Sequence, residues 1–200
     1  MDILIIFIIS YLIGTIHPAY ILTKLITKED IRQSGSNNSG TSNAVLKLGW
    51  KFGIIVGAID ILKGVLAVLI AKYFFKGDIS LMYFAGTSAI IGHIFPFYLK
   101  FRGGKGLATL GGIYIAINPL WALGGALIFF AVSFISNYIV VGTATVSIGF
   151  VILTYLKYGI GNAFYLSLFI AILILSKHHA NYIKILKKEE HKFRDPFKKK

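Results

Sequence analysis

The segment GHIFPFYLKFRGGKGLAT, from Gly92 to Thr109, separates two long apolar stretches with a basic, glycine-rich loop. Its cations are Lys100, Arg102 and Lys105, and the last of these lies within the sequence GGKG. Glycines expose backbone N–H groups and cations supply charge, so such a loop is typical of a site for an anion, most often a phosphate. The apolar sequence on both sides predicts that this site lies at the surface of a membrane.

The composition also indicates an integral membrane protein. Of the 200 residues, 56% are hydrophobic and only 14% are charged, against roughly 25% charged residues in a soluble domain. The absence of cysteine excludes disulfides, thiol nucleophiles and zinc–cysteine sites. The net charge of +13 is concentrated in loops and in the tail. This pattern favours the cytoplasmic excess of Lys and Arg that orients membrane proteins over nucleic-acid binding, and anionic substrates are a second, compatible reason.

Seven apolar ranges are candidates for membrane helices, because a spanning helix needs about 20 apolar residues. The chain begins with MDILIIFIIS, which lacks the positive start and small-residue cleavage site of a secretory signal, so the first range is expected to be retained. The fourth range is too short to span a bilayer alone. The ranges are Ile3–Leu25, Phe52–Phe75, Ile79–Leu99, Leu107–Ile117, Leu120–Ile135, Ile139–Leu156 and Ile160–Leu175.

The positions of the charges predict the topology. The segment before Asn43, the glycine loop and the C-terminal tail hold most of the charge and are expected to be cytoplasmic. The N-terminus then lies outside, and the number of crossings is odd. We therefore predict an all-α integral membrane protein, a compact bundle of about seven transmembrane helices, with five as the alternative. Residues 1–200 are expected to form one polytopic domain, with a basic cytoplasmic tail at 177–200.

Ionisable residues also occur inside the predicted spans. Asp60 and Lys63, in the sequence DILKG, are three residues apart and therefore share one helix face. Charges within a membrane are costly and normally face the interior of a bundle. We expect this pair either to support a polar cavity or to lock two helices together, without a catalytic role. His17, next to Pro18 in the first span, is interpreted as a packing polar group rather than a ligand.

Two polar motifs combine backbone flexibility with polar or charged groups. GSNNSGTSN, residues 35–43, could form a phosphate nest or an ordinary polar loop, and Arg32 and Lys47 flank it. GGKG, residues 103–106, precedes a helical run from Leu107, and a helix start presents free N–H groups to an anion. This is not a nucleotide P-loop, because Leu99 stands at the first glycine position and Gly106 replaces the Ser or Thr.

A third motif, KHHANYIKILKKEEHKF, follows the last apolar range at residues 177–193. The helical spacing of His178, Asn181 and Lys184 could direct one polar face toward the other motifs. The alternative is a basic amphipathic tail on anionic lipid. No His is followed by Asp five positions later, and no plausible Ser–His–Asp set is present. Any acyl transfer would therefore depend on positioning and electrostatics.

The order and spacing of these motifs resemble the bacterial membrane acyl-phosphate:glycerol-3-phosphate acyltransferases over almost the whole chain. The pattern GHxFPxxxxFxGGKGxAT is its most specific element. The resemblance implies a helix bundle with three cytoplasmic motifs converging on one site in the bacterial plasma (inner) membrane. It implies transfer of an acyl group from acyl phosphate to the 1-hydroxyl of glycerol 3-phosphate, giving lysophosphatidic acid for phospholipid synthesis. It implies no cofactor, metal, acyl-CoA, nucleic acid or obligate protein partner, and membrane lipids as the surroundings.

The resemblance also implies roles for individual residues, which are assigned to the matching positions of this sequence. Catalytic roles fall on Ser36, Lys105, His178 and Asn181. Substrate binding falls on Asn38, Asn43, Lys47, Gly103, Gly104, Gly106 and Thr143, and structural support on Asp60, Lys63, His93 and Glu190. The chain departs from the family pattern at Asn37, Leu46, Asn137 and Val140, where Gly, Arg, Arg and Ser are usual.

These departures leave two alternatives. One is a divergent paralogue that uses another acyl donor or another phosphorylated acceptor. The other is a non-catalytic lipid-phosphate binder or transporter, which is disfavoured because the sequence has no inverted repeat.

Overall fold

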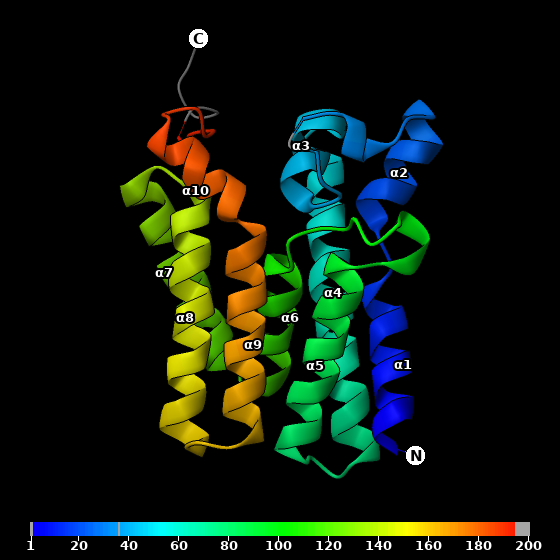
Figure 1. Ribbon diagram of the computed structural model, residues 1–200, viewed down its shortest axis with the longest axis vertical. Coiled ribbons are helices and arrows are strands. Elements are labelled where there is room, and N and C mark those ends of the chain that lie inside the picture. Colours follow the sequence, from blue (N-terminus) through cyan, green and yellow to red (C-terminus); the bar gives the residue numbers. More distant parts are fainter. Residues whose placement is uncertain (1, 36, 195–200) are drawn as a thin grey trace. The chain divides into compact units, whose positions relative to one another are not determined.

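The computed structural model describes residues 2–35 and 37–194. Within these ranges the chain is helical and contains no strand, which confirms the predicted all-α class. The chain forms two compact units, Met1–Ile117 and Asn118–Lys200, which we describe separately (Figure 1). The prediction of a single domain over residues 1–200 stays a prediction.

The first unit contains six α-helices and two short 3-10 helices among its described residues. Helix α4 packs against α3, α5 and α6, and α1 packs against α5 (Figure 1). The backbones of α4 and α6 approach closely, because a Cβ at Gly64 would lie 2.2 Å from the carbonyl oxygen of Thr109. Small residues at such contacts are typical of membrane helices. The elements are α1 Asp2–Gly14, α2 Pro18–Thr27, η1 Ile31–Gln33, α3 Thr41–Leu48, α4 Trp50–Phe74, α5 Ile79–Ile94, η2 Phe97–Leu99 and α6 Leu107–Ile117.

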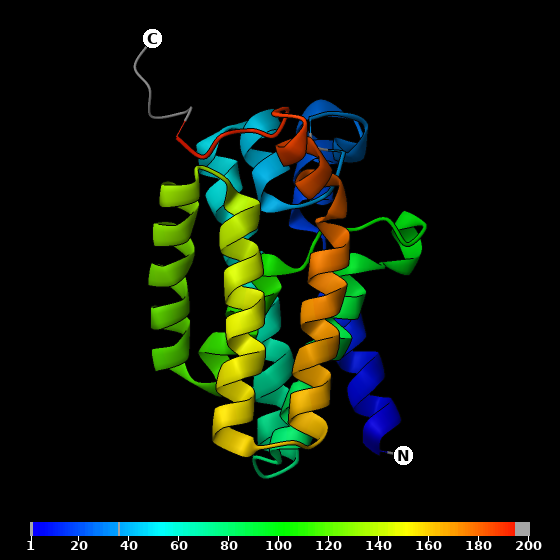
Figure 2. The ribbon, with the colours of Figure 1, turned by 60° about the vertical axis from the view of Figure 1, so that its left-hand side comes forward.

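The second unit has three long helices and a short terminal one in its described part. They are α7 Pro119–Ser136, α8 Ile139–Tyr158, α9 Asn162–Lys177 and α10 His179–Leu186. Helix α8 lies between α7 and α9 (Figure 2). The start of α7 is fixed by Asn118, whose side-chain oxygen accepts from the N–H groups of Leu120 at 3.0 Å and Trp121 at 3.3 Å. Helices α9 and α10 meet at a bend of 48°.

The seven predicted apolar ranges are all largely helical. Among the described residues, five spans are long and apolar enough to cross a membrane, and the bent pair α9–α10 gives a sixth. Helix α6, of 11 residues, is as short as the sequence predicted. The number of crossings and the orientation of the N-terminus stay predictions. The five spans are Ile3–Thr27, Trp50–Phe74, Ile79–Leu99, Pro119–Ser136 and Ile139–Tyr158.

Two local features add detail to the predicted ranges. The first span is not one continuous helix, because α1 ends at Gly14 and α2 begins at Pro18. Proline has no N–H to donate to the preceding turn, but it is well suited to the first position of a new helix. The motif at residues 35–43 is not a loop throughout, because α3 already begins at Thr41, with Gly40 as its N-cap.

Candidate functional site

The first motif folds around the side chain of Asn43. This residue is fully buried. Its amide nitrogen, which carries two hydrogens, lies within hydrogen-bond distance of the carbonyl oxygens of Ile31 at 2.9 Å, Ser34 at 3.0 Å and Asn38 at 2.8 Å. Three carbonyls from different points of the loop thus meet at one amide group. Asn43, predicted to bind substrate, holds the shape of the motif in this structure.

Asn37 and Asn38 also shape this motif. The side-chain oxygen of Asn38 accepts from the N–H of Gly40 at 2.9 Å, at the start of α3. Asn37 has a φ of 55°, in the left-handed region that glycine adopts freely and asparagine tolerates better than most residues. Ser36, predicted to be catalytic, lies outside the described residues.

The second motif folds back over the end of α5. The N–H of Gly103 donates to the carbonyl of Ile94 at 3.1 Å, and that of Gly104 donates to the carbonyl of His93 at 3.0 Å. A Cβ at Gly104 would lie 2.1 Å from Nε2 of His93. These glycines are therefore required for close packing, in addition to any role toward an anion. Helix α6 begins at Leu107, as predicted, directly after Lys105 and Gly106.

A chain of buried polar groups lies beneath this turn. The ammonium of Lys63 lies 2.7 Å from Oδ1 of Asp60, and it donates to the carbonyl of Ile16 at 2.9 Å. It also lies 2.6 Å from Nδ1 of His93. An ammonium can only donate, so Nδ1 accepts and the ring proton of His93 lies on Nε2. Asp60 and Lys63 share one buried face, as predicted, and they connect α4 to α5 and to the break between α1 and α2.

His17 connects the first motif to His93. Its Nδ1 lies 3.0 Å from the hydroxyl oxygen of Ser39, and its ring stacks on that of His93 with centroids 5.1 Å apart. The expectation that His17 packs rather than binds a ligand agrees with its complete burial. The sequence did not show this connection between the two motifs, because only the fold brings Ser39 and His93 to the same imidazole.

Arg32 forms a second connection. Its guanidinium donates to Asp30 at 2.6 Å and to the carbonyl of Leu99 at 2.6 Å, with a longer contact of 3.4 Å to the carbonyl of Arg102. The hydrogen bonds from Arg32 hold the pKa of the Asp30 carboxyl below its usual value. The hydrogen bond with the Asp30 carboxylate in turn raises the pKa of the Arg32 guanidinium. The first motif and the basic loop are thus fastened together within the first unit.

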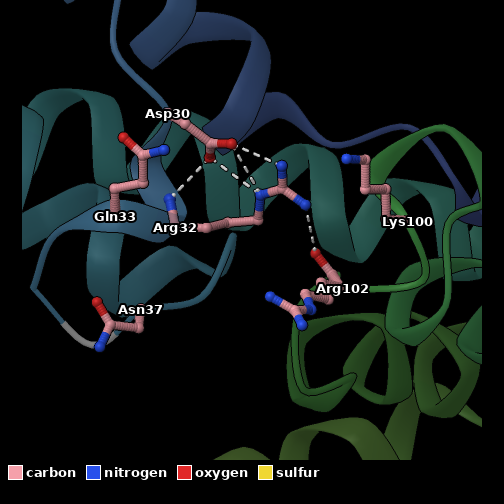
Figure 3. Close-up of a pocket in the computed structure, with 6 residues that line it drawn as sticks. All are labelled: Asp30, Arg32, Gln33, Asn37, Lys100 and Arg102. Carbon is pink, nitrogen blue, oxygen red and sulfur yellow. Dashed lines mark hydrogen bonds and ion pairs between the residues drawn. The ribbon is translucent and has the colours of Figure 1, made fainter.

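A cavity of about 660 Å³ lies beside this connection. Figure 3 shows the guanidinium of Arg32 directed toward the backbone of Arg102. Lys100 lies on the same side of Arg32 as Arg102 does. The sequence shows these three cations but does not predict the cavity, because 67 positions separate Arg32 from Leu99. The lining residues are Asp30, Arg32, Gln33, Asn37, Lys100 and Arg102.

The third motif lies in the second unit. The amide of Asn181 donates to Oε1 of Glu190 at 2.7 Å, so the fold brings together two of its predicted residues. Nδ1 of His178 lies 2.8 Å from the carbonyl of Ile174. A carbonyl can only accept, so Nδ1 carries the proton and Nε2 is the acceptor of the neutral ring. His178 is the N-cap of α10, so only Asn181 and Lys184 of the expected helical face lie within the helix.

The chain is similar to known proteins over most of its length. A profile described as "Glycerol-3-phosphate acyltransferase" matches residues 4–188. The chain belongs to the glycerol-3-phosphate acyltransferase family. It is 42% identical over 185 residues to the glycerol-3-phosphate acyltransferase of Thermoanaerobacter pseudethanolicus, covering 92% of each chain. It is 36% identical over 206 residues to that of Staphylococcus haemolyticus, covering 97% of this chain and 99% of the relative.

Solved structures of the family have the same fold. The glycerol 3-phosphate form of PlsY (YgiH), an integral membrane glycerol 3-phosphate acyltransferase, matches with a TM-score of 0.90 and 31% identity over 96% of each chain. Its lysophosphatidic acid form matches with a TM-score of 0.86 and 30% identity. These matches confirm the family resemblance and the membrane-protein class. Among the described residues, no group of three or more His, Cys, Asp or Glu could hold a metal ion.

Two departures from the glycerol-3-phosphate acyltransferase pattern lie on α3. Leu46 is 57% exposed, where the family usually has Arg. Lys47, displaced by one position and predicted to bind substrate, forms an ion pair with Glu29. This hydrogen bond lowers the pKa of the Glu29 carboxyl. The displaced cation is therefore already engaged with a carboxylate.

The other departures lie at the start of α8. Asn137 has a φ of 66° and ends α7 in the left-handed conformation that asparagine tolerates. Its carbonyl accepts from the N–H of Phe193 at 2.8 Å, and its side-chain oxygen accepts from that of Arg194 at 2.9 Å. Asn137 thus fastens the tail within the second unit. Thr143 is buried and donates to the carbonyl of Ile139 at 3.0 Å, and Val140 is buried beside it.

Proposed function

We propose that this protein transfers a fatty acyl group from acyl phosphate to the 1-hydroxyl of glycerol 3-phosphate, releasing lysophosphatidic acid and phosphate. The proposal rests mainly on the first two motifs, which His17 and Arg32 connect within one unit. Family membership supports glycerol 3-phosphate as the acyl acceptor. So do the solved relatives, which are described in glycerol 3-phosphate and lysophosphatidic acid forms.

The acceptor phosphate would bind at the second motif. Helix α6 begins directly after Gly106, so its first N–H groups and the positive end of its dipole favour an anion there. Lys105 would add a charge-assisted contact of the kind that phosphate favours. Ser36 and Asn38 of the first motif would complete the polar surroundings.

The third motif would supply the remaining polar groups. Asn181 is oriented by Glu190, and His178 is held by the carbonyl of Ile174 so that Nε2 is its acceptor nitrogen. Contacts within the second unit therefore fix the orientation of both side chains. We propose that this motif takes part with the first two in acyl transfer, at the cytoplasmic face of a bacterial plasma membrane.

The proposed reaction needs no nucleophile from the protein. The 1-hydroxyl oxygen of glycerol 3-phosphate attacks the acyl carbonyl carbon, and the bond from that carbon to the phosphate oxygen breaks. The hydroxyl proton passes to the departing phosphate, so atoms and charge balance without a protein base. The protein contributes positioning of the two substrates and stabilisation of the phosphate charges. This scheme agrees with the lack of a Ser–His–Asp set in the sequence.

One assay tests the donor and the acceptor together. Purified protein is incubated with glycerol 3-phosphate and either palmitoyl phosphate or palmitoyl-CoA, without added metal and after treatment with a chelator. We expect lysophosphatidic acid from palmitoyl phosphate and essentially none from palmitoyl-CoA. Equal turnover of both donors would contradict the donor assignment. No product from either donor, in a sample with intact helical content, would favour the non-catalytic alternative.

A further inference from the structure

The cavity lined by Arg32, Lys100 and Arg102 lies next to the ends of two candidate membrane spans. Lys100 follows directly after the span Ile79–Leu99, and Asp30 lies just beyond the span Ile3–Thr27. The hydrogen bond from Arg32 to the carbonyl of Leu99 shows that these two span ends are neighbours. A residue that directly follows a membrane span lies in the headgroup region, so the cavity is expected at that depth.

The charges of the cavity favour an anion. The carboxylate of Asp30 is compensated by Arg32 at 2.6 Å. Among the described residues, the side chains of Lys100 and Arg102 have neither an ion-pair nor a hydrogen-bond partner. Two positive charges therefore face the cavity without a counterion from the protein. A guanidinium and an ammonium that line one cavity offer charged donors of the kind that a phosphate group accepts.

The same loop presents aromatic side chains. Phe97 is 55% exposed, Tyr98 43% and Phe101 59%. Figure 2 shows the green segment after α5 as a loop that extends to the right of the view. The hydroxyl of Tyr98 donates to the carbonyl of Thr15 at 2.6 Å and fixes the base of the loop. Aromatic residues beside cations are typical of segments that lie at a membrane interface.

The backbone of this loop is held in an unfavourable conformation. Lys100 has a φ of 55° and Phe101 a φ of 58°, so two consecutive residues other than glycine are left-handed. Hydrogen bonds to the carbonyls of Pro96 at 3.0 Å and Leu99 at 3.2 Å, from Phe101 and Arg102, maintain the turn. Strain of this kind persists only where surrounding contacts impose it, and it is concentrated at functional sites.

We propose that this cavity binds the phosphate headgroup of an anionic membrane phospholipid. Lys100 and Arg102 contact the phosphate, and Phe97 and Phe101 lie at the headgroup end of the acyl chains. The exposed aromatic side chains favour a lipid over a soluble phosphate ester, which has no apolar part to cover them. The inference goes beyond the proposed acyl transfer, because none of residues 103–106 lines the cavity, and Asn37 alone does so among the described residues of the first motif.

The test measures lipid binding to the intact protein in detergent. The protein is titrated with dihexanoyl phosphatidylglycerol, dihexanoyl phosphatidylcholine, inorganic phosphate or glycerol 3-phosphate, and retention is measured by native mass spectrometry. The double variant Lys100→Gln/Arg102→Gln removes the proposed contacts. The matched control, Lys51→Gln/Lys72→Gln, removes two exposed lysines that do not line the cavity. The variant Lys100→Arg/Arg102→Lys keeps both charges and checks that the loop remains folded.

We expect phosphatidylglycerol to bind more tightly than phosphatidylcholine. Each basic residue at an anionic lipid surface strengthens binding by about fivefold, so the double variant should weaken phosphatidylglycerol binding by about 30-fold. The control should change it less than threefold, and the charge-preserving variant should retain it. Equal losses in the double variant and the control would overturn the proposal in favour of diffuse attraction. Displacement of the lipid by inorganic phosphate or glycerol 3-phosphate at similar concentrations would assign the cavity to a soluble phosphate instead.

Discussion

The imidazole of His17 lies between Ser39 and the ring of His93. Its Nδ1 is 3.0 Å from the Ser39 hydroxyl, and the two rings stack at 5.1 Å. His93 in turn supports the glycine turn through the hydrogen bond from Gly104. One buried side chain therefore couples the two motifs that are proposed to bind the substrates.

Replacement of His17 should impair catalysis through the loops that it positions. His17→Ala should lower kcat/KM by about 10- to 100-fold, because small misplacements of binding groups have large effects on rate. Ser39→Ala removes the same hydrogen bond from the other side, so the double variant should be little worse than His17→Ala. Steady-state kinetics on the four proteins tests this. Fully additive losses would show that the two residues act independently.

Gly104→Ala should disrupt the second motif. The added Cβ would lie 2.1 Å from Nε2 of the buried His93, so the turn must move. We expect a loss of about 1–3 kcal/mol in stability, the usual effect of overpacking, together with lower kcat/KM. Gly111→Ala is the matched control, since a Cβ there meets no atom within 4 Å. It should be neutral or slightly stabilising, and thermal unfolding of both variants in one detergent gives the comparison.

The pair Asp60–Lys63 should be sensitive to removal of one partner. Lys63→Ala leaves the buried carboxylate of Asp60 without its counter-charge and should cost about 3–5 kcal/mol. The double variant Asp60→Leu/Lys63→Met should recover most of this loss, because an apolar pair avoids the burial of charge. Thermal unfolding measures both, with Lys72→Ala, an exposed lysine on α4, as the control. If the double variant is stable but inactive, the pair supports the site and does not merely lock helices.

The basic residues near the two motifs should differ in importance. Lys105→Ala should lower kcat/KM by about 10- to 150-fold, the loss of one charged contact to phosphate. Lys47→Ala should have a much smaller effect, because Lys47 is paired with Glu29. Leu46→Arg should raise kcat/KM by about tenfold by restoring a guanidinium where the family usually has one. Loss of turnover in Lys47→Ala, with no gain in Leu46→Arg, would instead identify Lys47 as the substitute.

The Asp30–Arg32 pair predicts a pH dependence of stability. The folded-state pKa of Asp30 is lowered, so its contribution is fully present above the unfolded value of about 4. It is lost as the pH falls through the lower folded value. The difference in Tm between the wild type and Asp30→Asn should therefore be constant from pH 7 to 5 and should shrink below about pH 4. A difference that grows toward acid pH would contradict the assignment.

The sequence by itself determined the helical class, the positions of the apolar ranges and the three polar motifs. These features are local, because hydropathy over about 20 residues and the spacing within a motif require no knowledge of distant contacts. The shared face of Asp60 and Lys63 could also be predicted, since helix geometry fixes the relation between residues three apart. The start of α6 after GGKG was also predictable, because it depends on the local change from a glycine-rich to an apolar sequence.

Only the tertiary structure decided which residues meet across the chain. The contact between Arg32 and Leu99, the link from Ser39 through His17 to His93, and the cation-lined cavity all join segments far apart in sequence. The periodicity of apolar residues does not predict such contacts, because they depend on how α1, α4 and α5 pack. The break at His17 shows the same limit. Pro18 indicates that a helix is interrupted. The partner of the opened turn comes from another helix, because the ammonium of Lys63 on α4 donates to the carbonyl of Ile16.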